Sequence, residues 1–208
     1  MKYVNEKNIP NLVIDLRGNT GGNRAAVILL AKYLMDTVFS YSILQPKLRT
    51  RKYMNSKGKF YLALSKLKYN LGNIFKGHQT AAGREFVYRY QPKKNTYKGK
   101  IFVITDGFTA SASTMLTSWL KQHVNTTFVG ERAGGGYNGN NGGSFPILTL
   151  PMSKVEINFP AYRLILDPAS DNKKGIIPNV QPPVTIQDII QKRDVEMETI
   201  LNIIKSNK

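Results

Sequence analysis

Two segments rich in glycine and hydroxyl side chains hold the residues that could do chemistry in this sequence. Residues 17–22 read RGNTGG and residues 106–113 read DGFTASAS. A serine hydroxyl at the start of a helix lies in the positive end of the helix dipole, where a developing anion is favoured. Ser111 is therefore a candidate nucleophile, and the N–H of Ala112 a candidate oxyanion donor. The alternative role for Ser111 is helix N-capping, for which serine is among the preferred residues.

The glycines of the first segment offer a second oxyanion donor. Gly21 and Gly22 let the backbone approach a ligand closely and adopt conformations closed to other residues. A backbone N–H from either glycine could complete an oxyanion hole with Ala112. The alternative is a tight turn that serves only the close packing of a helix against a strand.

Each segment follows an apolar run that predicts a buried strand, residues 11–16 and 100–105, and each precedes a predicted helix. This alternation is typical of an α/β layer, in which working residues lie at the C-terminal ends of strands. The predicted elements are strands at 11–16, 84–90, 100–105 and 127–130, helices at 24–39, 60–75, 111–123 and 186–204, a loop at 134–143 and a hairpin at 145–159.

Charge is the unusual feature of the composition. The formal net charge is +17, and residues 46–100 hold fifteen Lys or Arg against one acid, Glu85. Such a block could face nucleic acid, an anionic membrane surface or an acidic substrate. A solvated surface is the favoured interpretation, because no nucleic-acid motif accompanies the charge. We therefore expect no nucleic-acid partner, and contact with an anionic membrane stays open.

The sequence also excludes several kinds of site. It has no cysteine, which rules out disulfides, Cys-based zinc sites and a cysteine nucleophile. It has only two histidines, which argues against a multi-histidine metal centre. We expect neither a metal nor an organic cofactor.

Four motifs, kept in order and spacing, resemble those of the tail-specific (C-terminal processing or tricorn-like) serine peptidases. They are LVIDLRGNTGG, ITDGFTASASTM, TTFVGERAGGGYNG, and the pair LTLPMSKVEINFP with GIIPNV. The resemblance implies an α/β fold related to the Clp protease and crotonase superfamily, with a mixed β-sheet flanked by helices. It predicts a single peptidase core domain over residues 1–208 with a basic insertion at about 41–98.

The resemblance also implies roles for individual residues. Ser111 takes the place of the family nucleophile, which supports Ala112, Gly21 and Gly22 as the oxyanion hole. Supporting roles are expected at Gln122, Glu131 and Asp106, where a helix-surface, capping or loop-bracing role is the alternative.

The general base is the main departure from the family pattern. The lysine of the C-terminal processing branch would fall at Gly136, and no lysine lies nearby. The tricorn-like branch uses a histidine upstream of the first motif. His123, twelve residues after Ser111 on one helix, is about 18 Å away along the axis, and His78 lies in the basic insertion. We therefore expect the base in an N-terminal portion of the same protein that precedes this chain, and we expect an exported, periplasmic or cell-envelope protein.

The expected activity is that of a serine endopeptidase cleaving unfolded or C-terminally exposed polypeptides through an acyl-enzyme at Ser111. One alternative is a catalytically inactive peptide-binding module of the same fold. Another is a protein that binds membrane surfaces or anions through the basic block.

Overall fold

The computed structural model describes residues 2–46, 54–72, 77–123, 125–143, 145–150 and 152–206. Parts of the predicted basic insertion, at 47–53 and 73–76, lie outside the described residues. The chain divides into two compact units, each discontinuous in sequence. The first comprises residues 1–39, 90–138 and 169–208, and the second comprises 40–89 and 139–168.

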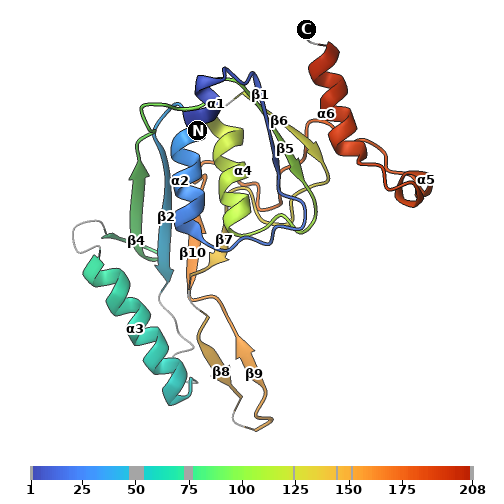
Figure 1. Ribbon diagram of the computed structural model, residues 1–208. Helices are drawn as coiled ribbons and strands as arrows, with labels where there is room; N and C mark the ends of the chain where they lie inside the picture. Colours follow the sequence, from blue (N-terminus) through green and yellow to red (C-terminus); the bar gives the residue numbers. More distant parts are fainter. Residues whose placement is uncertain are drawn as a thin grey trace. The chain divides into compact units, whose positions relative to one another are not determined.

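The first unit is built on a parallel three-stranded sheet. Its strands are β1 (Asn11–Asp15), β5 (Lys100–Thr105) and β6 (Thr126–Gly130), in the order β1-β5-β6. Central β5 pairs with β1 through residues 100–104 and with β6 through residues 101–105. Its residues 101–104 are fully buried, as expected for a parallel strand covered on both faces. The C-terminal ends of all three strands therefore lie at one edge of the sheet (Figure 1).

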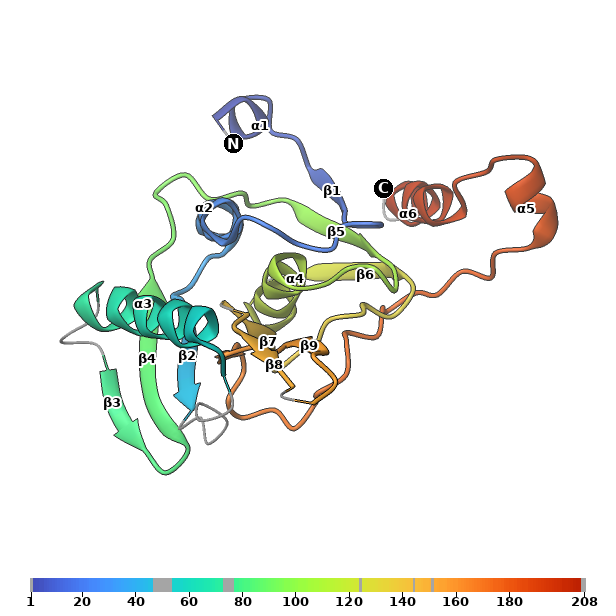
Figure 2. The same cartoon turned by 90° about the horizontal axis from the view of Figure 1, so that it is seen from below.

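Helices cover both faces of this sheet. Helix α6 (Val195–Ser206) packs on one face, where Ile200 joins Phe102 and Ile104 of β5. Helices α2 (Arg24–Leu34) and α4 (Ala112–His123) pack against each other, and α4 lies on the opposite side of β5 from α6 (Figure 2). The short helices α1 (Lys2–Glu6) and α5 (Ile186–Ile190) complete the unit.

Two predicted helices are shorter than their sequence patterns indicated. The helix expected at 24–39 ends at Leu34, because Met35 is already extended at φ −81° and ψ 145°. The helix expected at 186–204 is two helices. A capping box of Thr185 and Asp188 starts the first, Lys192 adopts a left-handed φ of 53°, and the Asp194 carboxylate accepts the N–H of Met197 to start the second.

The second unit holds the other two sheets. A five-stranded sheet has the order β3-β4-β2-β10-β7, and β8 and β9 form an antiparallel hairpin. Their bounds are β2 (Phe39–Pro46), β3 (Gly77–Thr80), β4 (Gly83–Tyr90), β7 (Gly139–Gly142), β8 (Ile147–Thr149), β9 (Glu156–Asn158) and β10 (Tyr162–Ile165). The one helix among this unit's described residues is α3 (Ser56–Gly72). No described helix in the chain is long and apolar enough to cross a membrane.

These elements confirm the α/β fold class and the mixed strand directions. The predicted hairpin and the strand at 84–90 are also present. Strands β2, β3 and β10 were not predicted, and β7 lies inside the segment expected to be a loop. The division of domains stays a prediction, although the basic insertion at about 41–98 overlaps the second unit up to Arg89.

Candidate functional site

The turn between β5 and α4 presents Ser111 in a conformation that few residues adopt. Ser111 has φ 54°, in the left-handed region, and it immediately precedes the first residue of the helix, Ala112. A non-glycine residue in this region is uncommon and occurs often at functional turns. A sharp strand-to-helix turn of this kind lifts a nucleophile clear of the sheet. Ser111 is exposed, whereas Ala112 is buried.

The first backbone N–H of α4 belongs to Ala112. No described residue accepts a hydrogen bond from it, and the Ser111 hydroxyl has no described partner either. The next N–H, of Ser113, already donates to the carbonyl of Ala110 at 3.1 Å. The first N–H of α4, next to Ser111 in sequence, is thus a fixed donor at the positive end of the helix.

The glycine-rich loop after β1 meets this turn directly. The N–H of Ala110 donates to the carbonyl of Asn19 at 3.2 Å, which joins the two loops. A Cβ built on Gly21 would lie 2.7 Å from both the N of Ala112 and the Cβ of Ser111. Only glycine fits there, and its φ of 101° also requires glycine. The structure therefore brings Gly21, Ser111 and Ala112 together.

The two glycines differ as oxyanion donors. The N–H of Gly21 donates to Oδ1 of Asn19 at 3.0 Å, so it is engaged in this structure. The N–H of Gly22 has no acceptor among the described residues, and a Cβ there would meet nothing within 4 Å. Gly22 is consequently the freer donor of the pair, and Gly21 is the closer to Ser111.

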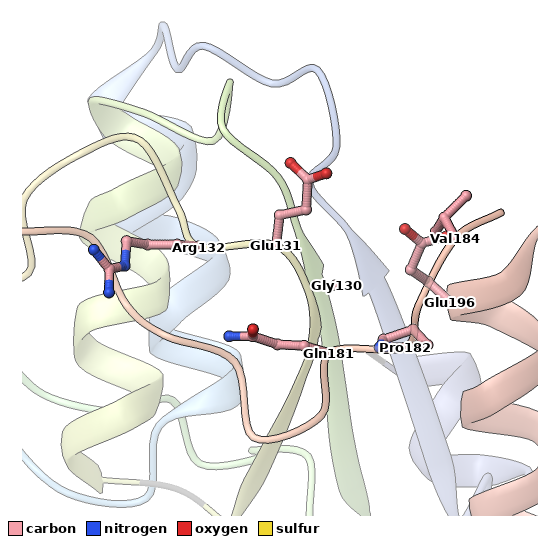
Figure 3. A pocket seen from close by; sticks show the side chains of 7 residues that line it. All are labelled: Gly130, Glu131, Arg132, Gln181, Pro182, Val184 and Glu196. Carbon is pink, nitrogen blue, oxygen red and sulfur yellow. The ribbon is translucent and has the colours of Figure 1, made fainter. Parts of the chain in front are cut away.

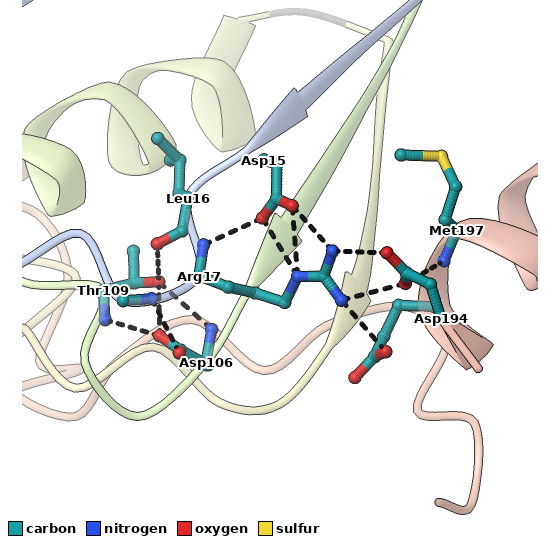
Figure 4. Close-up of polar contacts among 9 residues, drawn as sticks. Asp15, Leu16, Arg17, Asp106, Thr109, Asp194 and Met197 are labelled. Carbon is teal, nitrogen blue, oxygen red and sulfur yellow. Dashed lines mark hydrogen bonds and ion pairs between the residues drawn. The ribbon is translucent and has the colours of Figure 1, made fainter. Parts of the chain in front are cut away.

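Asp106 holds together the turn of residues 106–111 between β5 and α4, which carries the candidate nucleophile Ser111 and is called the nucleophile turn below (Figure 4). Its Oδ1 accepts the N–H groups of Phe108 and Thr109, both at 3.0 Å. Its Oδ2 accepts the N–H of Gly18 at 2.8 Å, which ties the turn to the glycine-rich loop. The Thr109 hydroxyl donates to the carbonyl of Leu16 at 3.0 Å and adds a second tie. These bonds to the backbone are those that a loop-bracing residue makes, and a supporting role of Asp106 in catalysis stays a prediction.

A second glycine-rich loop packs beneath the same turn. A Cβ on Gly134 would lie 2.1 Å from the carbonyl oxygen of Gly107. A Cβ on Gly135 would lie 2.0 Å from Oγ1 of Thr114, and its N–H donates to the carbonyl of Thr109 at 3.0 Å. Contact with this turn thus explains the two glycines Gly134 and Gly135 of the AGGG sequence.

Glu131 lies at the end of β6 and lines a pocket. Its backbone pairs with Thr105 at the end of β5, with N–H to carbonyl at 2.8 Å. The pocket measures about 660 Å³ and is also lined by Gly130, Arg132, Gln181, Pro182, Val184 and Glu196. The side chains of Glu131 and Arg132 point in different directions from the strand end (Figure 3). The structure therefore places Glu131 beside the end of β5, and its supporting role in catalysis stays a prediction.

Gln122 and His123 lie far along α4 from Ser111, and His78 belongs to the other unit. Gln122 is exposed in the last turn of α4, eleven residues on, or about 16 Å along the helix axis. His123 is the last residue of the same helix. His78 lies on β3 in the second unit, where its Nε2 is 3.5 Å from a carboxylate oxygen of Glu85.

Arg17 forms an ion-pair cluster that the sequence reasoning missed (Figure 4). Its guanidinium binds Asp15 of β1 at 2.6 Å and Asp194 at 2.8 Å, with Glu196 at 3.3 Å. Hydrogen bonds from Arg17 hold the pKa values of Asp15 and Asp194 below the ordinary aspartate range. The arginine of the DLRGN motif thus anchors the glycine-rich loop to the start of α6, a role that its position in that motif could have indicated.

Comparisons with known proteins bear on the family and the fold of the chain. Residues 1–181 match the model of peptidase family S41. A crystal structure from Parabacteroides merdae, assigned as a peptidase, is similar over 97% of this chain and 54% of its own, at TM-score 0.61 and 18% identity. Mature CPAF bound to lactacystin is similar over 97% of this chain and 44% of its own, at TM-score 0.61 and 15% identity.

The photosystem II D1 C-terminal processing protease also matches, over 91% of this chain and 40% of its own, at TM-score 0.51 and 20% identity. The search of curated proteins returned no match. At these identities the structural likeness shows the fold alone. The chain spans about half the length, or less, of the solved structures that it matches.

Proposed function

Because the chain belongs to peptidase family S41, whose fold suggests serine protease activity, we propose that Ser111 is the nucleophile of a serine-type endopeptidase. The observation that carries this proposal is the backbone of Ser111. Its left-handed φ of 54° presents an exposed side chain immediately before α4, beside Gly21, where an added Cβ would force the neighbouring backbone to move. Strain of this kind persists only where the surrounding structure enforces it.

In the proposed reaction the Ser111 Oγ attacks the carbonyl carbon of a peptide bond, and its proton passes to a base. The carbonyl oxygen becomes an oxyanion, which the N–H groups of Ala112 and Gly22 stabilise. One such donor is worth about 3 kcal/mol in the transition state. The C–N bond then breaks, the amine leaves with a proton, and water hydrolyses the acyl-enzyme. Gly21 would join as a donor only if its hydrogen bond to Asn19 Oδ1 opened.

The general base is proposed to come from a part of the protein other than the residues that the structure describes around Ser111. His123 lies about 18 Å from Ser111 along α4, and no described hydrogen bond or ion pair joins His78 to Ser111. Support for a base elsewhere comes from the longer length of the solved structures that the chain matches. The tail-specific, tricorn-like assignment, unfolded or C-terminally exposed substrates, and export to the periplasm or cell envelope belong to the same proposal.

A second candidate function is a peptide-binding module without turnover. One observation favours it: the hydroxyl of Ser111 has no base as a hydrogen-bond partner among the described residues. Such a module would keep the Ala112 and Gly22 donors for a bound peptide carbonyl. It would hold substrate without cleaving it.

Casein cleavage by the full-length protein distinguishes the two candidates. We expect cleavage that disappears in Ser111→Ala and persists in Ser113→Ala, which removes a neighbouring buried hydroxyl. Cleavage that survives Ser111→Ala would refute the assignment of the nucleophile. Peptide binding without cleavage by the unsubstituted protein would favour the binding module.

A further inference from the structure

Helix α3 has one face fixed against the second unit. A Cβ on Gly58 would lie 2.4 Å from the carbonyl oxygen of Ile147 on β8, so the helix backbone touches the hairpin there. Leu62 is 2% exposed, and the hydroxyl of Ser65 is 3.0 Å from that of Tyr162 on β10. These contacts, which place α3 beside the five-stranded sheet in Figure 2, define its inward face.

The opposite face of α3 is an exposed apolar stripe. Phe60 and Leu71 are each 64% exposed, Leu64 is 51% and Leu67 is 53% exposed. At about 100° per residue, these four positions fall within an arc of about 60° on the side away from Leu62. A stripe of four large apolar side chains that the fold leaves uncovered is a typical interaction surface.

Lysines border this stripe and no acid opposes them. Lys57 adjoins the stripe, about 20° from Leu64 around the helix, and exposed Lys59 lies about 80° beyond Leu67 on the other side. Helix α3 contains no Asp or Glu. The second unit as a whole carries thirteen Lys or Arg and three Asp or Glu. The partner of this face should therefore combine an apolar interior with negative charge.

We propose that α3 docks flat on an anionic lipid membrane, with the stripe Phe60, Leu64, Leu67 and Leu71 entering the acyl boundary. Lys57 and, through its long side chain, Lys59 would reach the headgroups, as in interfacial amphipathic helices. A nucleic acid fits less well, because leucines offer no flat face for base stacking. A second copy of the chain would bring the same positive charge to the contact. This surface is separate from the reaction proposed for Ser111, so either can fail without the other.

Vesicle flotation of the 208-residue chain tests the proposal. The probes are phosphatidylcholine vesicles alone and the same vesicles with about 30% phosphatidylserine, each at low and high salt. We expect binding to the anionic vesicles only, weakened by salt. Leu64→Ser and Leu67→Ser should each weaken it by about tenfold, from the apolar area that each leucine would bury. Lys57→Gln should weaken it about fivefold.

The matched control is Ile190→Ser on α5, an aliphatic side chain that is 70% exposed in the first unit. It should leave vesicle binding unchanged. Thermal unfolding of each variant checks the fold, which the exposed positions should preserve. The proposal is overturned if anionic vesicles do not bind, or if the leucine variants bind as the unsubstituted chain does. It is equally overturned if those variants instead abolish self-association measured without lipid, or if single-stranded RNA binds with the same dependence on Leu64 and Leu67.

Discussion

Replacing Gly21 with alanine tests the close contact between the glycine-rich loop and the nucleophile turn. The added Cβ would lie 2.7 Å from the Ala112 N, 2.7 Å from the Ser111 Cβ and 2.8 Å from the Ala110 oxygen. Two of these atoms are backbone, so the turn itself must move. Overpacking of this kind costs about 1–3 kcal/mol, and the φ of 101° adds about 1–3 kcal/mol of backbone strain.

Gly22→Ala is the matched control, because Gly22 has φ 135° and nothing within 4 Å of an added Cβ. It should cost only the backbone strain, about 1–3 kcal/mol. In urea titrations of the 208-residue chain, we therefore expect Gly21→Ala to lose about 2 kcal/mol more than Gly22→Ala. In the full-length protein Gly21→Ala should lower kcat/KM about a hundredfold, since a displacement of about 1 Å in a catalytic group has that effect. Equal stabilities of the two variants would refute the contact.

Three further changes test the supports of the site. Arg17→Ala should lower the free energy of unfolding by about 1–2 kcal/mol at pH 7 in urea titrations, because several charge-assisted bonds are lost at a partly exposed cluster. Arg17 lowers the folded-state pKa of Asp15 and Asp194. The stabilisation is therefore fully present above the ordinary aspartate pKa of about 4, and it should fade as the pH falls through the lowered pKa values. A difference in unfolding free energy between Arg17→Ala and the unsubstituted chain that does not change with pH would contradict the cluster. Gly135→Ala should lower the unfolding temperature, and adding Thr114→Ala should restore part of that loss, because Thr114 Oγ1 would lie 2.0 Å from the new Cβ. A double variant that unfolds at the same temperature as Gly135→Ala alone would contradict this contact. Gln122→Ala should leave casein cleavage by the full-length protein unchanged, and a loss above about tenfold would mean that Gln122 reaches the site after all.

The sequence predicted the parallel layer of the fold well, because its strands are continuous apolar runs. Residues 100–105 read KIFVIT, and the buried strand β5 spans the same residues. Where strands are polar or short, no such pattern exists. Strand β7 reads GNNG and β3 reads GHQT, and both form because a neighbouring strand supplies their hydrogen bonds. Tertiary pairing of this kind cannot be inferred from local periodicity.

The central residues of the candidate site could be predicted from the sequence, but the side-chain hydrogen bonds around them could not. Ser111, Ala112 and Gly21 were identified from motifs, and the structure brings them together. The hydrogen bond from the Gly21 N–H to Asn19 Oδ1 was not predicted, because it depends on a side-chain rotamer within the loop. The contact of Arg17 with Asp194 joins residues far apart in sequence, so only the folded chain reveals it.

The most direct measurement of the central claim is mass spectrometry of the full-length protein after reaction with a fluorophosphonate, which phosphonylates activated serines. We expect one adduct, on the peptide that contains Ser111, and none in Ser111→Ala. An adduct on Ser113, or on any serine in the Ser111→Ala variant, would contradict the assignment of Ser111 as the nucleophile.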